Sequence, residues 1–258
     1  MIGEECKSPG STGRRETAGL QMLRSDAAEI ELLERSVRAL FDGKTELSIL
    51  EAGCGPSWPL RLNGVKYRLT GVDLDEAALH RRKTVARDLD EAIVGDLRHI
   101  DFGSRRFDVI YNAFVLEHVA DAARVMENFG RWLRPGGLLI VLLPDRDTVF
   151  GFVTRMTPLW FHVMYHRYLL GKKNAGKAGY GPYPTYYEPI VSRRGIREFC
   201  INHRFQVVEE RGLCTYEIRR TAGTRLVRAI ARAVSALSFG ELPWRYNNLT
   251  YVLKKQPA

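Results

Sequence analysis

The stretch Ile49-Leu-Glu51-Ala-Gly53-Cys-Gly55-Pro decides the fold of this 258-residue chain. It joins a short apolar run, typical of a buried β-strand, to a turn with two glycines two residues apart. Glycine lets the backbone turn sharply and approach a ligand that a Cβ atom would exclude. The stretch therefore predicts a strand followed by a ligand-binding turn in an α/β protein.

An acidic residue follows this turn at a spacing that suits ribose binding. Asp73 lies about 20 positions after Gly53, at the end of the next predicted strand, in Gly71-Val-Asp73-Leu-Asp75. A carboxylate there can accept hydrogen bonds from both hydroxyls of an adenosine ribose. These features alone leave open a dinucleotide such as NAD, and also a tight turn followed by a solvated aspartate. Trp58 replaces the third glycine of the dinucleotide pattern, which argues against pyrophosphate binding.

Outward from this stretch, apolar runs alternate with helical patterns. We expect strands at 47–51, 67–73, 91–96, 107–112, 138–143, 205–208 and 248–253. We expect helices at 21–41, 75–89, 119–133 and 192–202. This alternation predicts a mostly parallel sheet with helices on both faces.

Five short motifs follow one another between Ile49 and Asp147. They are Glu51-Ala-Gly-Cys-Gly55, Gly71-Val-Asp73, Val94-Gly-Asp96-Leu, Phe107-Asp-Val-Ile-Tyr-Asn112 with Leu116-Glu-His118-Val, and Leu133-Arg-Pro-Gly-Gly137. In this order they resemble the motifs of class I S-adenosylmethionine-dependent methyltransferases, in particular the small-molecule (type 11-like) branch. The resemblance implies a Rossmann-like, seven-stranded, mostly parallel sheet with helices on both faces, an antiparallel last strand and an inserted cap. It also implies S-adenosyl-L-methionine as the cofactor.

The resemblance further implies which residues bind the cofactor. Asp73 would hold the ribose, and Asp96 would accept a hydrogen bond from the adenine amino group while Leu97 offers its backbone. The predicted cofactor-binding set is Glu51, Ala52, Gly53, Cys54, Gly55, Asp73, Leu74, Asp96, Leu97 and Asn112. We interpret Cys54 as a small residue between glycines and not as a nucleophile.

His118 is the predicted catalytic residue, because it follows the fourth strand near the expected position of the methyl group. It could act as a general base for a hydroxyl acceptor. The alternative is a structural or cofactor-side role, since Glu-His at this place recurs in relatives with unlike acceptors. Weaker candidates for contacts with the acceptor are His162, His166, Tyr186, Tyr187 and Glu188.

The chain is expected to form one domain. We interpret residues 1–20 as a mobile tail and 21–258 as a methyltransferase domain with its core at 45–147. Two insertions depart from the family pattern, at 145–190 and 213–246, and a connection as long as the first is usually functional. We expect both insertions to cover the acceptor site.

Two segments of these insertions have the character of membrane-surface helices. Pro158 to Leu170 is apolar and aromatic but too short to span a bilayer. In a helix over 225–237, Arg225, Arg228 and Arg232 fall on one face, opposite Leu226, Ile230, Val234 and Leu237. Such a helix suits an anionic membrane surface. The alternative is that both segments are cap helices that pack on the core and on each other.

Charge and composition narrow the function further. The net charge of +9 favours an anionic partner or simply aids solubility. The start of the chain has no secretory signal, and the four cysteines lack metal spacing, so we expect a cytoplasmic protein, peripheral to the membrane if the basic helix binds there. We predict methyl transfer to a small-molecule, glycan or lipid-linked acceptor, at oxygen.

Three other functions stay open. One is a basic RNA methyltransferase, although Asn112-Ala-Phe114 differs from the Asn/Asp-Pro-Pro-aromatic signature of enzymes that methylate base amino groups. Nucleic acid is therefore a disfavoured partner. The others are a non-catalytic module that binds S-adenosylmethionine and an NAD- or nucleotide-dependent enzyme.

Overall fold

The computed structural model describes residues 19–164, 167–168, 171, 173–176, 181, 183–215 and 222–257. His166 and residues 1–18 of the predicted tail lie outside the described residues.

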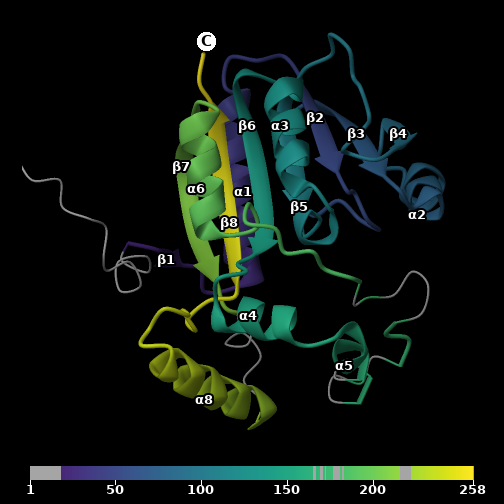
Figure 1. Cartoon of the computed structure of the whole chain (residues 1–258). Helices are drawn as coiled ribbons and strands as arrows, with labels where there is room; N and C mark the ends of the chain where they lie inside the picture. Colours follow the sequence, from purple (N-terminus) through teal and green to yellow (C-terminus); the bar gives the residue numbers. More distant parts are fainter. Residues whose placement is uncertain are drawn as a thin grey trace, which may run out of the picture.

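Within the described residues, strands form one eight-stranded sheet in the order β1-β7-β8-β6-β5-β2-β3-β4 (Figure 1). The strands are β1 (Gln21–Met22), β2 (Leu47–Ala52), β3 (Tyr67–Asp73), β4 (Glu91–Val94), β5 (Phe107–Ala113), β6 (Leu133–Pro144), β7 (Phe205–Leu213) and β8 (Asn248–Lys255). The helices are α1 (Asp26–Phe41), α2 (Glu76–Arg81), η1 (Arg82–Ala86), η2 (Leu116–His118), α3 (Ala122–Trp132), α4 (Val149–Met156), α5 (Leu159–Met164), α6 (Arg193–Asn202) and α8 (Ala222–Leu237).

The sheet confirms the predicted fold class, with one strand more than expected. The last strand, β8, runs antiparallel to both β6 and β7, as predicted, while the other pairs are parallel. The extra strand is β1, which pairs with β7 through Gln21 and Met22. The predicted helix over 21–41 was therefore wrong at its start. It begins only after Ser25, whose side chain accepts a hydrogen bond from Ala28 N at 3.1 Å and caps the helix.

Several other predicted elements differ in length: β7 continues to Leu213 instead of ending at 208, β4 ends at Val94, and α3 begins only at Ala122. The helix expected over 75–89 is a short α-helix, α2, continued by the π-helical turn η1, which ends at Arg87 in the left-handed region (φ 54°). The strand expected over 138–143 extends back to Leu133, which pairs with Phe107, while the Arg-Pro-Gly-Gly segment bulges from β6 before pairing resumes between Leu138 and Val109. Helix α6 follows the predicted cap, since the Ser192 side chain accepts a hydrogen bond from Gly195 N.

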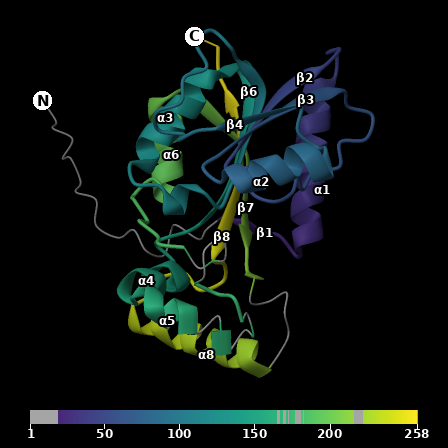
Figure 2. The same ribbon diagram turned by 90° about the vertical axis from the view of Figure 1, so that its right-hand side faces the viewer.

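Helices cover both faces of the sheet. Figures 1 and 2 show α3 and α6 on one face and α1 and α2 on the other. On the first face Phe129 and Phe199 belong to one apolar core, and on the second Leu33 and Leu79 belong to another. Both cores are closed by apolar strand residues, so the central strands β2, β5, β6 and β8 are buried on both sides, as in a mostly parallel sheet.

The two predicted insertions form helices beyond one end of the sheet. Helices α4 and α5 follow directly after β6, and α8 lies beside them in both views (Figures 1 and 2). The first insertion is helical in part, and Thr148 caps α4 by accepting a hydrogen bond from Gly151 N at 3.1 Å. None of the helices in the described part of the chain is long and apolar enough to cross a bilayer.

Asp108, at the start of β5, joins three strands at their amino ends. Its buried carboxylate accepts hydrogen bonds from Lys44 Nζ (2.6 Å), Ser48 N (2.9 Å) and Arg134 Nη1 (2.8 Å). Burial alone would raise the pKa of Asp108, but these three donors outweigh it and hold the pKa below its usual value. The carboxylate therefore stabilises the fold in its charged form.

We predict that Asp108→Ala lowers the free energy of unfolding by about 1–3 kcal/mol, because the Ser48 N–H loses its buried acceptor. The half-exposed cations add less, since solvent screens them. The measurement is urea denaturation, with the exposed Asp42→Ala as control. The deficit should be full above the unfolded pKa of about 3.9 and shrink as pH falls through the lower folded pKa. Equal stability of the two variants would contradict this role.

Candidate cofactor and catalytic site

The glycine-rich turn directly after β2 contains two glycines with different roles. Gly53 (φ 76°) and Gly55 (φ 52°) both lie in the left-handed region that favours glycine. A Cβ atom on Gly53 would lie 2.3 Å from Cγ2 of Val115, whereas the Cβ position of Gly55 faces open space. Gly53 therefore permits close packing on the segment after β5, and Gly55 leaves room that a ligand can approach.

Asp73 lies directly beside this turn, as predicted. Its Oδ2 accepts a hydrogen bond from Gly55 N at 3.0 Å, and its Oδ1 accepts one from Asp75 N at 2.9 Å. Each carboxylate oxygen keeps a further lone pair, and the side chain is only half-buried. The carboxylate can therefore accept two more hydrogen bonds, which fits a ribose with two hydroxyls. Leu74, the next residue, is exposed at the same edge.

A fully buried arginine, Arg82, which was not predicted as a site residue, binds the turn. Arg82 donates to Glu51 Oε2 (2.8 Å), to the Cys54 carbonyl (2.7 Å) and to Asp88 Oδ1 (2.9 Å). Burial raises the pKa of the Glu51 carboxyl, and the Arg82 guanidinium opposes that rise. The contact that the structure gives to Glu51 is thus Arg82, and its predicted contact with the cofactor stays a prediction.

Cys54 has the environment of a packing residue. Its side chain is buried, and a Cβ atom on Gly71 would lie 3.1 Å from its Sγ. Burial raises the pKa of the Cys54 thiol to about 12, so the thiol is protonated at neutral pH. A protonated, enclosed thiol is inert, in agreement with its interpretation as a small residue between glycines.

Asp96, which follows β4, is held by a second arginine that was not predicted. Arg98 donates to both carboxylate oxygens through Nε and Nη2, the shortest contact being 2.6 Å. This pairing keeps the pKa of Asp96 below its usual value. Next to it, the Leu97 carbonyl accepts from Asn128 Nδ2 at 2.8 Å. The predicted adenine contact of Asp96 requires an oxygen that Arg98 shares.

Two buried polar atoms near the end of β5 lack partners among the described residues. Asn112 donates through Nδ2 to the Ala52 carbonyl at 2.8 Å, which links the ends of β5 and β2, but its Oδ1 has no partner there. Glu117 Oε2 is in the same situation, and burial raises the pKa of Glu117 to about 8. Orphaned buried polar atoms are costly and commonly await a ligand. They fit a cofactor that brings its own donors and acceptors.

His118 is fixed in one tautomer by the first insertion. Its Nδ1 lies 2.8 Å from the Pro184 carbonyl, which can only accept, so Nδ1 carries the proton and Nε2 keeps its lone pair. Burial lowers the pKa of His118, although the carbonyl contact opposes this. The ring also lies edge-on to Tyr183, at 5.7 Å between centroids. His118 is thus neutral near pH 7 and presents a basic nitrogen.

The weaker candidates in the insertion fall into two groups. The Tyr186 amide donates to the Glu117 carbonyl at 2.8 Å, which brings this exposed tyrosine beside η2, while Tyr187 is buried. The Glu188 carboxylate accepts hydrogen bonds from the Asp121 and Ala122 amides, which stabilises the start of α3. His162 is bound to Thr157 between α4 and α5. Tyr183, which lies edge-on to His118, was not among the predicted residues.

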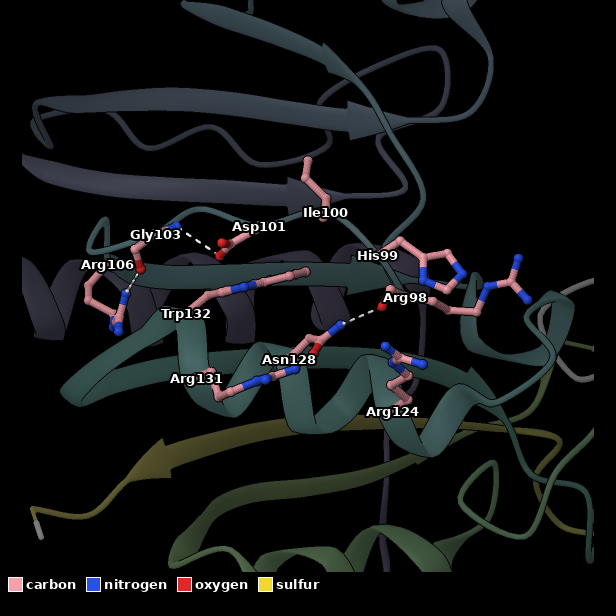
Figure 3. Close-up of a pocket in the computed structure, with 10 residues that line it drawn as sticks. All are labelled: Arg98, His99, Ile100, Asp101, Gly103, Arg106, Arg124, Asn128, Arg131 and Trp132. Carbon is pink, nitrogen blue, oxygen red and sulfur yellow. Dashed lines mark hydrogen bonds between the residues drawn. The ribbon is translucent and has the colours of Figure 1, made fainter.

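An arginine-rich cavity of about 290 Å³ lies beside the site, between the loop after β4 and helix α3 (Figure 3). Its lining includes Arg98, Arg106, Arg124, Arg131 and His99, with Asp101 as the opposing acid. Arg98 connects this cavity to the site, since it also pairs with Asp96. The cavity is suited to an anion, and no motif in the sequence indicated it.

We predict that Arg82→Leu lowers the free energy of unfolding by about 3–5 kcal/mol, because it leaves Glu51 and Asp88 without their buried counter-charge. The measurement is guanidinium denaturation, with the exposed neighbour Arg81→Leu as the matched control. The double variant Arg82→Leu/Glu51→Leu should regain part of the loss, since it removes both buried charges. If Arg82→Leu unfolded at the same midpoint as Arg81→Leu, the proposed support of the turn would be wrong.

The segment that carries these residues is similar to known proteins. A family model described as "Methyltransferase domain" matches residues 50–141. A probable S-adenosylmethionine-dependent methyltransferase of Mycolicibacterium smegmatis is 37% identical over 103 residues, which are 39% of this chain and 39% of that protein. A demethylmenaquinone methyltransferase of Bacillus mycoides is 26% identical over 191 residues, 70% of this chain and 75% of that protein.

The fold has known counterparts as well. The S-adenosylmethionine-dependent methyltransferase from Mesorhizobium loti superposes with a TM-score of 0.53 at 17% identity, over 86% of this chain and 96% of that one. At 17% identity this likeness shows the fold alone. The family model matches the segment in which the five motifs lie. In its fold and over residues 50–141 the chain is similar to S-adenosylmethionine-dependent methyltransferases, and it spans about two fifths of the length of the curated relatives that it matches first.

Proposed function

We propose that this protein transfers the methyl group of S-adenosylmethionine to an oxygen nucleophile on a small-molecule, glycan or lipid-linked acceptor. The observation that carries the proposal is His118, whose Nδ1–H is held by the Pro184 carbonyl, so that Nε2, 3.9 Å from Glu117 Oε1, keeps the lone pair that can take a proton. The name of the Bacillus mycoides relative, demethylmenaquinone methyltransferase, supports a small-molecule acceptor.

The residues of the site divide the work of such a transfer. S-adenosylmethionine, when bound, supplies an electrophilic methyl group on a sulfonium that leaves as a neutral thioether. Asp73 and the Gly55 edge of the turn would hold the ribose side, and Asn112 would offer its unpaired oxygen. As the acceptor oxygen forms its bond to the methyl carbon and the carbon–sulfur bond breaks, His118 Nε2 takes the hydroxyl proton. Alignment of the reacting atoms supplies most of the rate enhancement, because it can lower the activation free energy by about 7–11 kcal/mol.

The test is transfer of a labelled methyl group from S-adenosylmethionine to a panel of hydroxylated lipids, glycans and small molecules. We predict that His118→Ala lowers kcat by about 10²–10⁴ with little change in affinity for the cofactor. His80→Ala, an exposed histidine on α2, is the control. If His118→Ala kept the wild-type kcat, a structural role would replace the catalytic one.

The pH dependence follows from the environment of His118. Because burial lowers the pKa of His118 from 6.5, its basic form should persist below that pH. Wild-type kcat should therefore stay level through neutral pH and fall only below about 6.5, as the imidazole becomes protonated. A decline that begins well above neutrality would argue against a neutral His118 as the base.

Methylation of RNA is the second candidate, which the arginine-rich cavity favours. If RNA were the acceptor, Arg124→Ala and Arg131→Ala would each reduce the salt slope of RNA affinity by about 1. We expect instead that RNA binding is weak and that these variants behave like the exposed Arg35→Ala and Arg81→Ala controls. A steep salt slope that only the cavity variants reduce would favour RNA over a small acceptor.

A further inference from the structure

Three helices from the two insertions lie together at one end of the molecule. Figure 1 shows α4, α5 and α8 below the sheet, and Figure 2 shows them on the same side of the molecule, with α8 next to α4. We call them the basic helical layer. Helix α8 packs on α4 through an inward face that includes Ala231 and Ser235, both buried. The opposite faces of these helices are left without a partner among the described residues.

The central parts of the two insertions carry charge of one sign, with acidic residues only toward their ends. Neither residues 148–187 nor residues 218–240 contain an aspartate or a glutamate. The same two segments contain ten basic residues: Arg155, Arg167, Lys172, Lys173, Lys177, Arg219, Arg220, Arg225, Arg228 and Arg232. These ten account for more than the whole net charge of +9, so the rest of the chain is close to neutral. Four of these ten, Arg155, Arg225, Arg228 and Arg232, lie on the helices of the basic helical layer, which carry no acidic residue.

Large apolar side chains face water in the same layer. Trp160 is 63% exposed and Met156 is 69% exposed on the α4–α5 side. On α8, Leu226, Ile230 and Leu237 are 63%, 55% and 80% exposed and fall on one helix face. Val234, which was predicted to share that face, is instead half-buried. Large exposed apolar side chains that gather at one end of a domain mark an interaction site.

We propose that the basic helical layer docks on the surface of an anionic lipid bilayer. Exposed tryptophan and aliphatic side chains can enter the boundary of the acyl region, while arginines bind lipid phosphates. Arg228 and Arg232 lie over the Trp244 ring, at 5.5 and 5.2 Å from its centroid, which holds both guanidinium groups at the edge of α8. A second copy of this chain is a poor occupant, because it would bring an equally positive layer against this one.

The layer is connected to the site through the chain itself. The insertion that forms α4 and α5 continues into the segment whose Pro184 carbonyl holds His118. An acceptor resident in the bilayer would therefore meet a base whose tautomer is set by the docking insertion. This inference rests on the proposed function and names its acceptor class: an amphiphile with an apolar tail in the membrane and a hydroxyl at its surface.

The test is co-flotation of the full chain with vesicles of phosphatidylcholine containing a quarter phosphatidylglycerol, beside vesicles of phosphatidylcholine alone. We expect binding to the anionic vesicles only, reduced by high salt. Arg155→Glu/Arg225→Glu should weaken that binding at least tenfold, whereas Arg35→Glu/Arg81→Glu, which changes the net charge equally on α1 and α2, should not. Trp160→Ser/Leu237→Ser should also weaken it, against Val85→Ser/Ile201→Ser, which removes equally exposed apolar groups elsewhere.

Two results would overturn the inference: no binding to anionic vesicles, or equal binding by the layer variants and their controls. Binding of an acidic protein or self-association through this face, without vesicle binding, would also overturn it. Calorimetric titration of each variant with S-adenosylhomocysteine keeps the two proposals apart. Variants that lose vesicle binding should retain wild-type affinity for that ligand, whereas failure of the proposed function would appear as vesicle binding without methyl transfer to any hydroxylated lipid.

Discussion

The buried guanidinium of Arg82 is the interaction on which the site depends. It donates to one carboxylate from β2, one carbonyl from the glycine-rich turn and one carboxylate that precedes β4. A planar, always charged group with five donors can join three acceptors in fixed geometry, which lysine could not do. Two hydrogen bonds thus hold the turn: Arg82 donates to the Cys54 carbonyl, and the Gly55 amide donates to Asp73. Pre-organisation of this kind removes the cost of ordering the loop when a ligand binds.

The catalytic side of the site is assembled from two parts of the chain that are far apart in sequence. The core supplies η2 with Glu117 and His118 after β5, and the first insertion returns to bind it through the Pro184 carbonyl and the Tyr186 amide. Glu188 then anchors the same segment at the start of α3. Because the insertion sets the tautomer of His118, changes in the insertion can act on the base directly. The same insertion carries two helices of the basic helical layer, so the proposed membrane docking and the proposed proton transfer would depend on one segment.

Local patterns in the sequence predicted much of this structure, and long-range contacts explain what they missed. The period of apolar residues placed most strands, and Gly53 and Asp73 were found because turn geometry and spacing depend on few neighbouring residues. Arg82 was missed because Arg81-Arg82-Lys83 has the composition of a solvated helix face. The contact between Pro184 and His118 was missed because every residue has a backbone carbonyl. The sequence therefore does not indicate which carbonyl binds the imidazole. The early end of α2 and the added strand β1 depend on tertiary contacts that local propensity does not contain.

The central claim is that the ends of β2 to β5 bind S-adenosylmethionine through Asp73 and the glycine-rich turn. Isothermal titration calorimetry of the purified chain with S-adenosylhomocysteine tests it most directly, with Asp73→Ala and the exposed Asp42→Ala as matched variants. The account predicts micromolar binding that Asp73→Ala abolishes and Asp42→Ala preserves, and no binding of NAD. Binding of NAD in place of S-adenosylhomocysteine, or equal affinity in wild type and Asp73→Ala, would contradict it.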